Sequence, residues 1–132
     1  MRRLFIWFLF LVFLALPGIV LAESKSFFDR STGDGAVTET LTATGQWGIR
    51  SVRFHMSSAG GVAENFVVTL DSGTNARHDA VLLTQDMTTV HDLVWGPGED
   101  GVIWFESTDS VNVAYANTNA RKWGLEIEWV SR

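Results

Sequence analysis

The sequence contains no cysteine in its 132 residues, and this absence excludes several kinds of structure at once. No disulfide can staple the fold, and no thiol is present to bind zinc or to act as a nucleophile. Lipid attachment through a cysteine is excluded for the same reason. We therefore expect stability to come from aromatic and β-branched packing, from oligomerisation, or from both.

Basic residues are also scarce, with 10 Lys and Arg against 15 Asp and Glu. All the acidic residues follow residue 22, whereas Arg2 and Arg3 precede it, so residues 23–132 carry a formal charge of 8 − 15 = −7. Nucleic acid requires a basic patch, and an anionic lipid surface repels an acidic domain. We therefore expect no nucleic acid and no membrane surface among the partners of residues 23–132.

Several catalytic motifs are missing as well. The chain has no Gly-x-Ser-x-Gly elbow, no phosphate loop and no dinucleotide fingerprint, and its histidines do not fall at metal-binding spacing. A Ser-His-Asp triad depends on geometry and not on order, so a small secreted hydrolase using His78 or His91 stays open as an alternative. Glu126 and Glu128 are two apart and could flank a glycosidic bond, but a solvent-facing row explains them more simply. We expect no enzyme.

Residues 1–22 have the layout of a secretory signal peptide. Basic Arg2 and Arg3 precede an apolar run from Leu4 to Leu16, which Pro17-Gly18 ends. Val20-Leu21-Ala22 then puts small or modest residues at the −3 and −1 positions of a cleavage site. The run is short for a spanning helix, which needs roughly 20 residues. We expect cleavage after Ala22 and a secreted or periplasmic protein; the alternative is an uncleaved anchor reaching to Ala22.

The C-terminal stretch shows the clearest strand pattern. Its apolar residues alternate with small or acidic ones, the first group being Trp123, Leu125, Ile127 and Trp129, and the second Gly124, Glu126 and Glu128. Successive side chains of a strand point to opposite faces, so this pattern predicts an apolar core face backed by an acidic outer face.

Seven earlier runs are similar, and turn residues separate them. With the last one they cover residues 37–43, 46–56, 64–70, 79–85, 89–95, 102–106, 110–116 and 122–130. Short strands at such spacing predict an all-β protein, a single antiparallel, jelly-roll-like β-sandwich of about eight strands over residues 37–132. Residues 23–36 are predicted to be a lead-in arm. The alternative is a mixed fold in which the run from Val81 to Thr89 is helical.

Two of these runs depart from simple alternation. In the run 46–56, Trp47 and Ile49 share one parity, whereas Val52 and Phe54 share the other. One extra residue would restore a common face, so a β-bulge is predicted near Arg50-Ser51. The run 79–85 holds three consecutive apolar residues and is expected in the sheet centre or under a loop.

Tryptophan provides the candidate binding residues. Five tryptophans follow residue 22, and a core of this size holds about three. A surplus indole could stack on a sugar ring or anchor a protein interface. Trp95, beside the Gly96-Pro97-Gly98 turn, and Trp104 are the best candidates for a ligand-binding site on a glycan or protein surface. The alternative is that all five indoles lie in the core.

Oxygen-rich loops raise the question of calcium. The candidate ligands are Asp71, Asn75 and Asp79 in one region, and Glu99, Asp100 and Asp109 in two others. The Asp-x-Asp-x-Asp-Gly loop pattern is absent. Turn formation and solubility account for these residues more simply, so we expect no cofactor, with a structural calcium as the alternative.

Several segments resemble a known group of proteins. They are Gly45-Gln46-Trp47, Ser51–Met56, Glu64–Ser72, Asp79–Asp86, Asp92–Trp95, Val113–Thr118 and Trp123-Gly124-Leu125. Together they resemble small β-sandwich proteins encoded among the tail and virion-structure genes of tailed phages and prophages. The resemblance implies a structural role and carries over no catalytic or binding residue. The predicted signal peptide departs from this group, because virion proteins assemble in the cytoplasm, and suggests an exported relative.

These observations lead to one function and one main alternative. We expect an exported, non-catalytic β-sandwich that is a structural or adhesion module. The Thr38, Thr40 and Thr42 row and the Phe27-Phe28 pair favour a homo-oligomer. The alternative is a carbohydrate-binding module that uses exposed Trp95 or Trp104.

Overall fold

Alternating apolar and polar residues become antiparallel strands in the computed structural model, which describes residues 25–97 and 101–132. Its elements follow in the order β1 (Lys25–Gly33), β2 (Val37–Thr42), β3 (Trp47–Met56), β4 (Asn65–Asp71), the 3-10 helix η1 (Ala76–His78), β5 (Ala80–Asp86), β6 (Asp92–Trp95), β7 (Ile103–Phe105), β8 (Ser110–Tyr115) and β9 (Trp123–Ser131). The predicted signal peptide, residues 1–22, lies outside the described residues. No described helix is long and apolar enough to cross a membrane.

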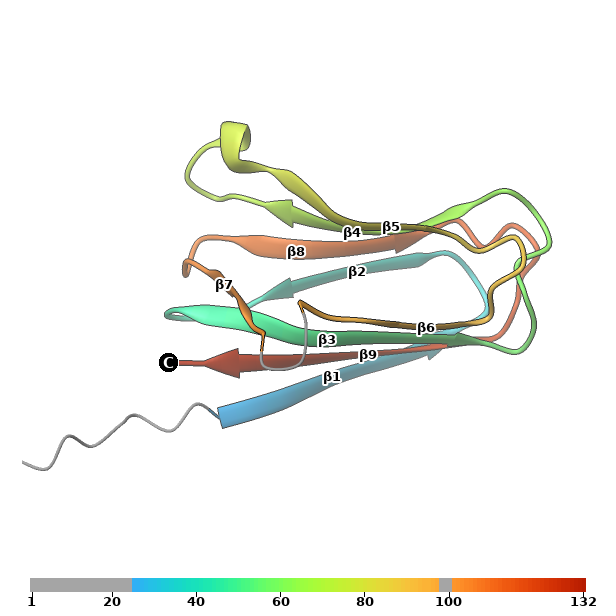
Figure 1. Ribbon diagram of the computed structural model, residues 1–132, viewed down its shortest axis with the longest axis horizontal. Helices are drawn as coiled ribbons and strands as arrows, with labels where there is room; N and C mark the ends of the chain where they lie inside the picture. The colour runs from blue at the N-terminus through green and yellow to red at the C-terminus, as the bar shows by residue number, and fades with distance from the viewer. Residues whose placement is uncertain (1–24, 98–100) are drawn as a thin grey trace, which may run out of the picture.

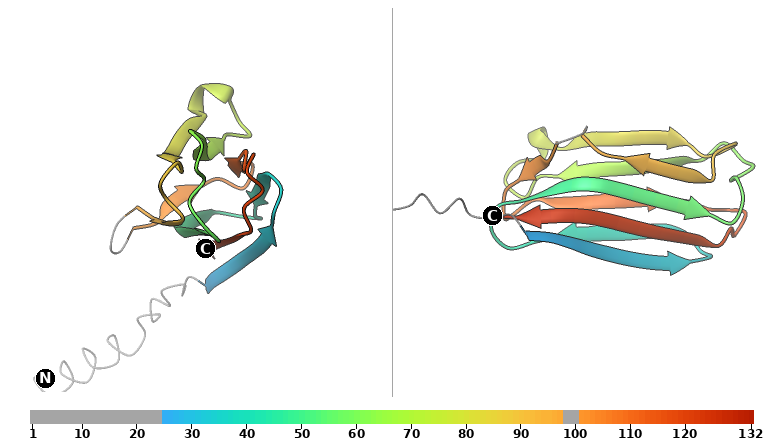
Figure 2. Two further views of the ribbon diagram at one scale, coloured as in Figure 1. Left: turned by 90° about the vertical axis from the view of Figure 1, so that its right-hand side faces the viewer. Right: turned by 60° about the horizontal axis from the view of Figure 1, so that its bottom comes forward.

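The strands form two packed sheets (Figure 1). One sheet has the order β1-β9-β3-β6, with β7 also paired to β3, and is called the β9 sheet here; the other, the β8 sheet, has the order β2-β8-β4-β5. Without β7, the two sheets have four strands each, and their order is that of a jelly roll. Figure 2 shows the two layers from other sides. The predicted β-sandwich is confirmed: each of the eight predicted runs contains a strand. The helical alternative for residues 81–89 is wrong, because β5 occupies most of that segment.

The ninth strand, β1, corrects the predicted lead-in arm. It pairs with β9 along its whole length, from Lys25 opposite Ser131 to Gly33 opposite Trp123. Among the described residues the sandwich therefore includes Lys25–Gly33, which precede the predicted start at residue 37. Its polar composition suits an edge strand, since few side chains there are covered by a second sheet.

The core lies between the two sheets and is built from their inward-facing residues. In β9 the predicted alternation holds, because Trp123, Leu125 and Ile127 are buried. Phe54 of β3 stacks on Phe66 of β4 with ring centroids 4.5 Å apart, which joins the two sheets. The fully buried side chains include Trp47, Ile49, Val52, Met56, Met87, Val68, Val111 and Val113.

Two β-bulges adjust which side chains face this core. The pairing of β3 with β9 shifts between Ile49 and Ser51, so the predicted bulge is confirmed. The pairing of β4 with β5 also shifts, which leaves Leu82 as an extra residue. This second bulge explains the three consecutive apolar residues of β5, because Leu82 and Leu83 both pack against the core while Val81 is 63% exposed. The strand β5 lies at the edge of its sheet and not at the centre.

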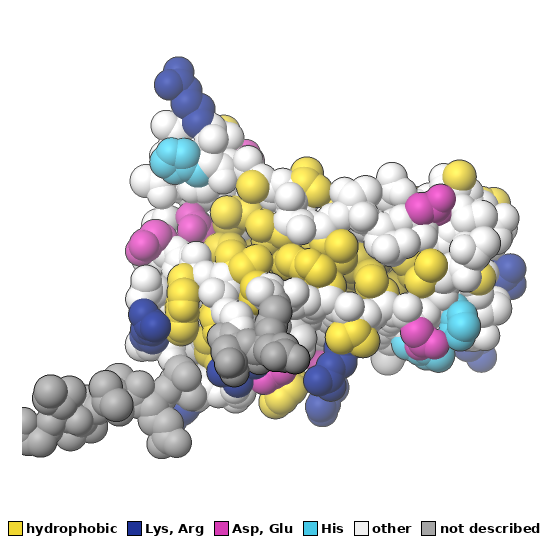
Figure 3. Space-filling view, in the orientation of Figure 1, with side chains coloured by type: hydrophobic (Ala, Val, Ile, Leu, Met, Phe, Trp, Pro, Cys, Tyr) yellow, Lys and Arg dark blue, Asp and Glu magenta, His cyan; other side chains and the backbone are white. Residues whose placement is uncertain are grey.

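One long side of the sandwich stays apolar at its surface. The edge strands β5 and β6 lie along it, and hydrophobic side chains form a band between the two sheets there (Figure 3). Leu83 of β5 with Leu93 and Trp95 of β6 are partly buried against the core. This band is the rim of the core and not a separate hydrophobic cluster.

Candidate functional site

The two predicted ligand-binding indoles lie on opposite faces of the β9 sheet. Trp95 is paired with fully buried Val52 and so points inward, where it packs against the core. Trp104 is paired with Gly48 and points outward, and the guanidinium of Arg132 lies over its ring, 4.0 Å from the centroid. The structure therefore does not bring Trp95 and Trp104 together on one platform.

The outer face of the β9 sheet carries a row of charges across three strands. Arg30 of β1 donates from Nε to Oε2 of Glu126 at 2.6 Å, and Arg53 of β3 donates from Nη1 to Oε1 of the same carboxylate at 3.0 Å. The hydrogen bond from Arg30 is the main reason that the pKa of Glu126 lies below its ordinary value. One carboxylate therefore holds two guanidinium groups in fixed positions, which we call the Arg30–Glu126–Arg53 row.

A second carboxylate on the same face is held in a similar way. Arg50 donates from Nη1 to Ser26 Oγ at 2.9 Å and lies 3.4 Å from Glu128 Oε1. Ser51 donates its hydroxyl to Glu128 Oε2 at 3.2 Å. The prediction that Glu126 and Glu128 point to the outer face is thus confirmed. However, their side chains are held by arginines and are only 20% and 14% exposed.

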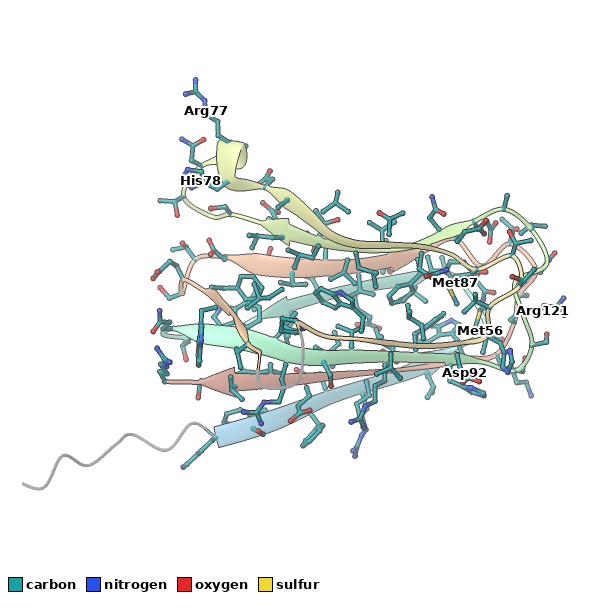
Figure 4. The ribbon with its side chains drawn as sticks, in the orientation of Figure 1. Met56, Arg77, His78, Met87, Asp92 and Arg121 are labelled. Carbon is teal, nitrogen blue, oxygen red and sulfur yellow. The ribbon has the colours of Figure 1, made fainter. Side chains whose placement is uncertain are left out.

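Two histidines share one carboxylate at one end of this face. His55 Nδ1 lies 2.5 Å from Asp92 Oδ1, and His91 Nε2 lies 3.0 Å from Asp92 Oδ2. The hydrogen bond with His55 is the main cause of the lowered pKa of Asp92. His78 lies on η1 at the other end of the molecule (Figure 4). The two histidines of the hydrolase hypothesis, His78 and His91, are therefore far apart.

A hollow of about 390 Å³ lies between the Arg30–Glu126–Arg53 row and the histidine pair. Gly124 helps to create it, because Thr32, Gly124 and His55 are opposite one another on neighbouring strands and Gly124 has no side chain. A Cβ at Gly124 would meet only Thr32 Cγ2, at 3.9 Å. This site, called the Gly124 hollow, is lined by Arg30, Ser31, Thr32, Arg53, Phe54, His55, Asp92, Leu93, Val94, Gly124, Leu125 and Glu126.

The outer face of the β8 sheet has the opposite character. Two rows cross its four strands, Thr38, Ala114, Val67 and Thr84 in one, and Thr40, Asn112, Thr69 and Val81 in the other. These eight residues, called the threonine face, carry no charge. The hydroxyl of Thr40 donates to Asn112 Oδ1 at 2.7 Å, so part of its polarity is satisfied internally. Sequence reasoning identified the threonines of β2 but not the neighbouring strands that extend them into a face.

Three of the candidate calcium ligands, Asn75, Asp79 and Asp109, accept backbone hydrogen bonds that hold loops. Asn75 Oδ1 accepts the backbone N–H of Arg77, and Asp79 Oδ1 accepts that of Ser72. Asp109 is buried and its Oδ2 accepts the backbone N–H of Glu106. Glu99 and Asp100 lie outside the described residues. Within residues 25–97 and 101–132, no group of three or more His, Asp or Glu side chains is arranged to hold a metal ion.

Comparisons with known proteins identify no family. No family model matches the sequence, and no curated protein matches it significantly. A structure of the Gx strain of infectious bursal disease virus is similar with a TM-score of 0.38 and 12% identity over 87% of this chain and 35% of that chain. For the Gt strain the TM-score is 0.33, with 11% identity over 84% of this chain and 31% of that chain.

This chain spans about a third of the viral chains that it matches. The finer relationship to phage tail proteins stays a prediction.

Proposed function

We propose that this protein is an exported, non-catalytic structural or adhesive β-sandwich that assembles with copies of itself through its threonine face. The observation that carries the proposal is the complete lack of charge across eight neighbouring residues on four strands. Surfaces of soluble domains are normally about one-quarter charged. A face of this size without charge is therefore suited to burial against a partner.

Where the partner is a second copy, electrostatics favours the threonine face over the β9 sheet as the surface of contact. Residues 23–132 carry a formal charge of 8 − 15 = −7, so two copies repel each other at most orientations. A two-fold contact sets one face against the same face. On the β9 sheet this would set the charged rows around Glu126 and Glu128 against their own copies. The eight residues of the threonine face carry no charge, and the acidic residues of the bordering rows, Asp71 and Asp86, lie at the periphery of such a contact.

The test is the oligomeric state of residues 23–132, measured by size exclusion with light scattering over a range of concentrations. We expect a mass that rises toward a dimer with concentration. Thr40→Lys places a buried charge in the contact and should give a monomer. Thr32→Lys makes the same change on the exposed outer face of the β9 sheet and should leave the dimer intact. A wild-type monomer at high micromolar concentration would refute self-association.

Export is tested separately. N-terminal sequencing of the protein recovered from a secreting host should begin at Glu23, which is the residue after the predicted cleavage site. Recovery of the intact chain in the membrane fraction would show that the leader is retained as an anchor.

A further inference from the structure

We propose that the Gly124 hollow binds an acidic saccharide, with the anionic group of the sugar between Arg30 and Arg53 and its hydroxyl groups toward His55 and Asp92. This inference names a ligand class for the proposed adhesive role, and it does not depend on self-association through the threonine face.

The two guanidinium groups are prepared for an anion. An arginine has five N–H donors, and among the described residues Arg30 uses Nε and Arg53 uses Nη1 toward Glu126, which leaves donors on both. Their side chains are 69% and 55% exposed, so these donors reach solvent. Glu126 neutralises one of the two positive charges, and the row keeps an excess of one. A carboxylate or sulfate could therefore accept charge-assisted hydrogen bonds from both guanidinium groups. Little side-chain entropy would be lost on binding, because Glu126 already holds the two arginines in place.

The rest of the hollow suits a sugar ring. Its volume of about 390 Å³ lies within the range of small-ligand sites. Val94 borders it and is 74% exposed, which offers an apolar contact for the C–H groups of a ring. Thr32, His55 and Asp92 supply donors and acceptors for hydroxyl groups. The carboxylate of Asp92 repels an anion, so it fixes the orientation with the charged group at the arginine end.

Glycine at position 124 keeps this space open and is not required by the backbone. It is not one of the described glycines with a positive φ, and an added Cβ meets no atom closer than 3.9 Å. A larger side chain there would fill the hollow while the sheet stays intact. Gly124→Val therefore tests occupancy of the hollow, and Arg53→Gln tests the charged fork.

The experiment is an NMR titration of residues 23–132 that follows the backbone amide of residue 124 and its neighbours. The probes are a uronate-containing disaccharide, a sulfated disaccharide and an uncharged disaccharide of the same size. We expect saturable shifts around Gly124 with at least one acidic probe and none with the uncharged one. Arg53→Gln and Gly124→Val should each weaken binding about tenfold or more. Comparing the two acidic probes distinguishes a carboxylate from a sulfate ligand.

Arg77→Gln is the matched control, because it removes the same charge from η1 at the other end of the molecule (Figure 4). It should leave the affinity unchanged. Equal weakening by Arg77→Gln and Arg53→Gln would show that net charge alone attracts the probe and would overturn the proposal. So would equal binding of the uncharged sugar, or no binding. Thr40→Lys should still bind, which separates a failure of this site from a failure of self-association.

Discussion

Phe27 stacks on Trp129 with ring centroids 4.4 Å apart and an interplanar angle of 19°. Trp129 also donates its indole N–H to Asp29 Oδ2 at 2.8 Å. Both contacts join β1 to β9, the first described strand to the last. These two side-chain contacts add to the backbone pairing of β1 with β9 and to the Arg30–Glu126 ion pair on the outer face.

Replacing Phe27 with alanine should therefore lower the free energy of unfolding by about 2 kcal/mol, because the change removes both apolar burial and an aromatic pair. Phe28→Ala is the control, since Phe28 points to the outer face and is 49% exposed; it should cost less than about 0.5 kcal/mol. Urea unfolding followed by tryptophan fluorescence measures both. Equal losses would mean that the stack does not hold β1.

The stack of Phe54 on Phe66 should couple the two sheets. In a double-mutant cycle with Phe54→Leu and Phe66→Leu, we expect the double mutant to lose about 1 kcal/mol less stability than the sum of the two single losses, because each single mutant already loses the ring contact. A second cycle that combines Phe66→Leu with Phe27→Leu serves as the comparison and should be additive. An additive first cycle would contradict the importance of the ring contact.

Gly73 should be intolerant of any side chain. A Cβ there would lie 2.0 Å from the backbone oxygen of Thr108, so the loop and the neighbouring turn cannot both keep their positions. Gly73→Ala should destabilise the fold by about 2 kcal/mol, as overpacking does. Gly35→Ala meets nothing within 4 Å and should be neutral or slightly stabilising. Thermal unfolding of the pair gives the comparison, and a neutral Gly73→Ala would contradict the close approach.

Acid should weaken the outer face of the β9 sheet. The pKa of Glu126 is lowered by Arg30, and that of Asp92 by His55, from ordinary values of 4.5 and 3.8. A carboxyl group with a lowered folded-state pKa stabilises the fold above its unfolded pKa, and this contribution is lost as pH falls through the folded value. Stability should therefore fall below about pH 4.5, and Glu126→Gln should flatten part of that fall. Urea unfolding between pH 3 and pH 6 measures it; an unchanged slope in the variant would contradict the role of Glu126.

The sequence predicted those parts of the fold that local alternation controls. In β9 every second residue is apolar, and the parity change near Arg50-Ser51 identified a bulge without any knowledge of its partner strand. The alternation does not reveal β1, because its only large apolar residues, Phe27 and Phe28, are adjacent and point to opposite faces. Met87 lies between the predicted runs 79–85 and 89–95, and it is fully buried. A segment between strands has no periodicity that could reveal this burial.

The candidate site was harder to predict because it depends on register between distant segments. Alternation showed that Glu126 points outward, but its two partners lie 96 and 73 residues earlier in the chain. The faces of Trp95 and Trp104 depend on how β6 and β7 pair with β3, which spacing alone does not determine. The sequence shows that position 124 has no side chain. It does not show that larger side chains on the neighbouring strands surround this position and so create a hollow.

The antiparallel pairing of β1 with β9 determines how the protein would be oriented if it were attached to a surface. Lys25 lies opposite Ser131, so the beginning of the described chain and its C-terminus leave the sandwich at the same pole (Figure 1). Asp92 lies at the opposite pole (Figure 4). In a copy that is attached to a surface through either end, the long axis of the sandwich would therefore point away from that surface. The histidine end of the Gly124 hollow would then face the solvent.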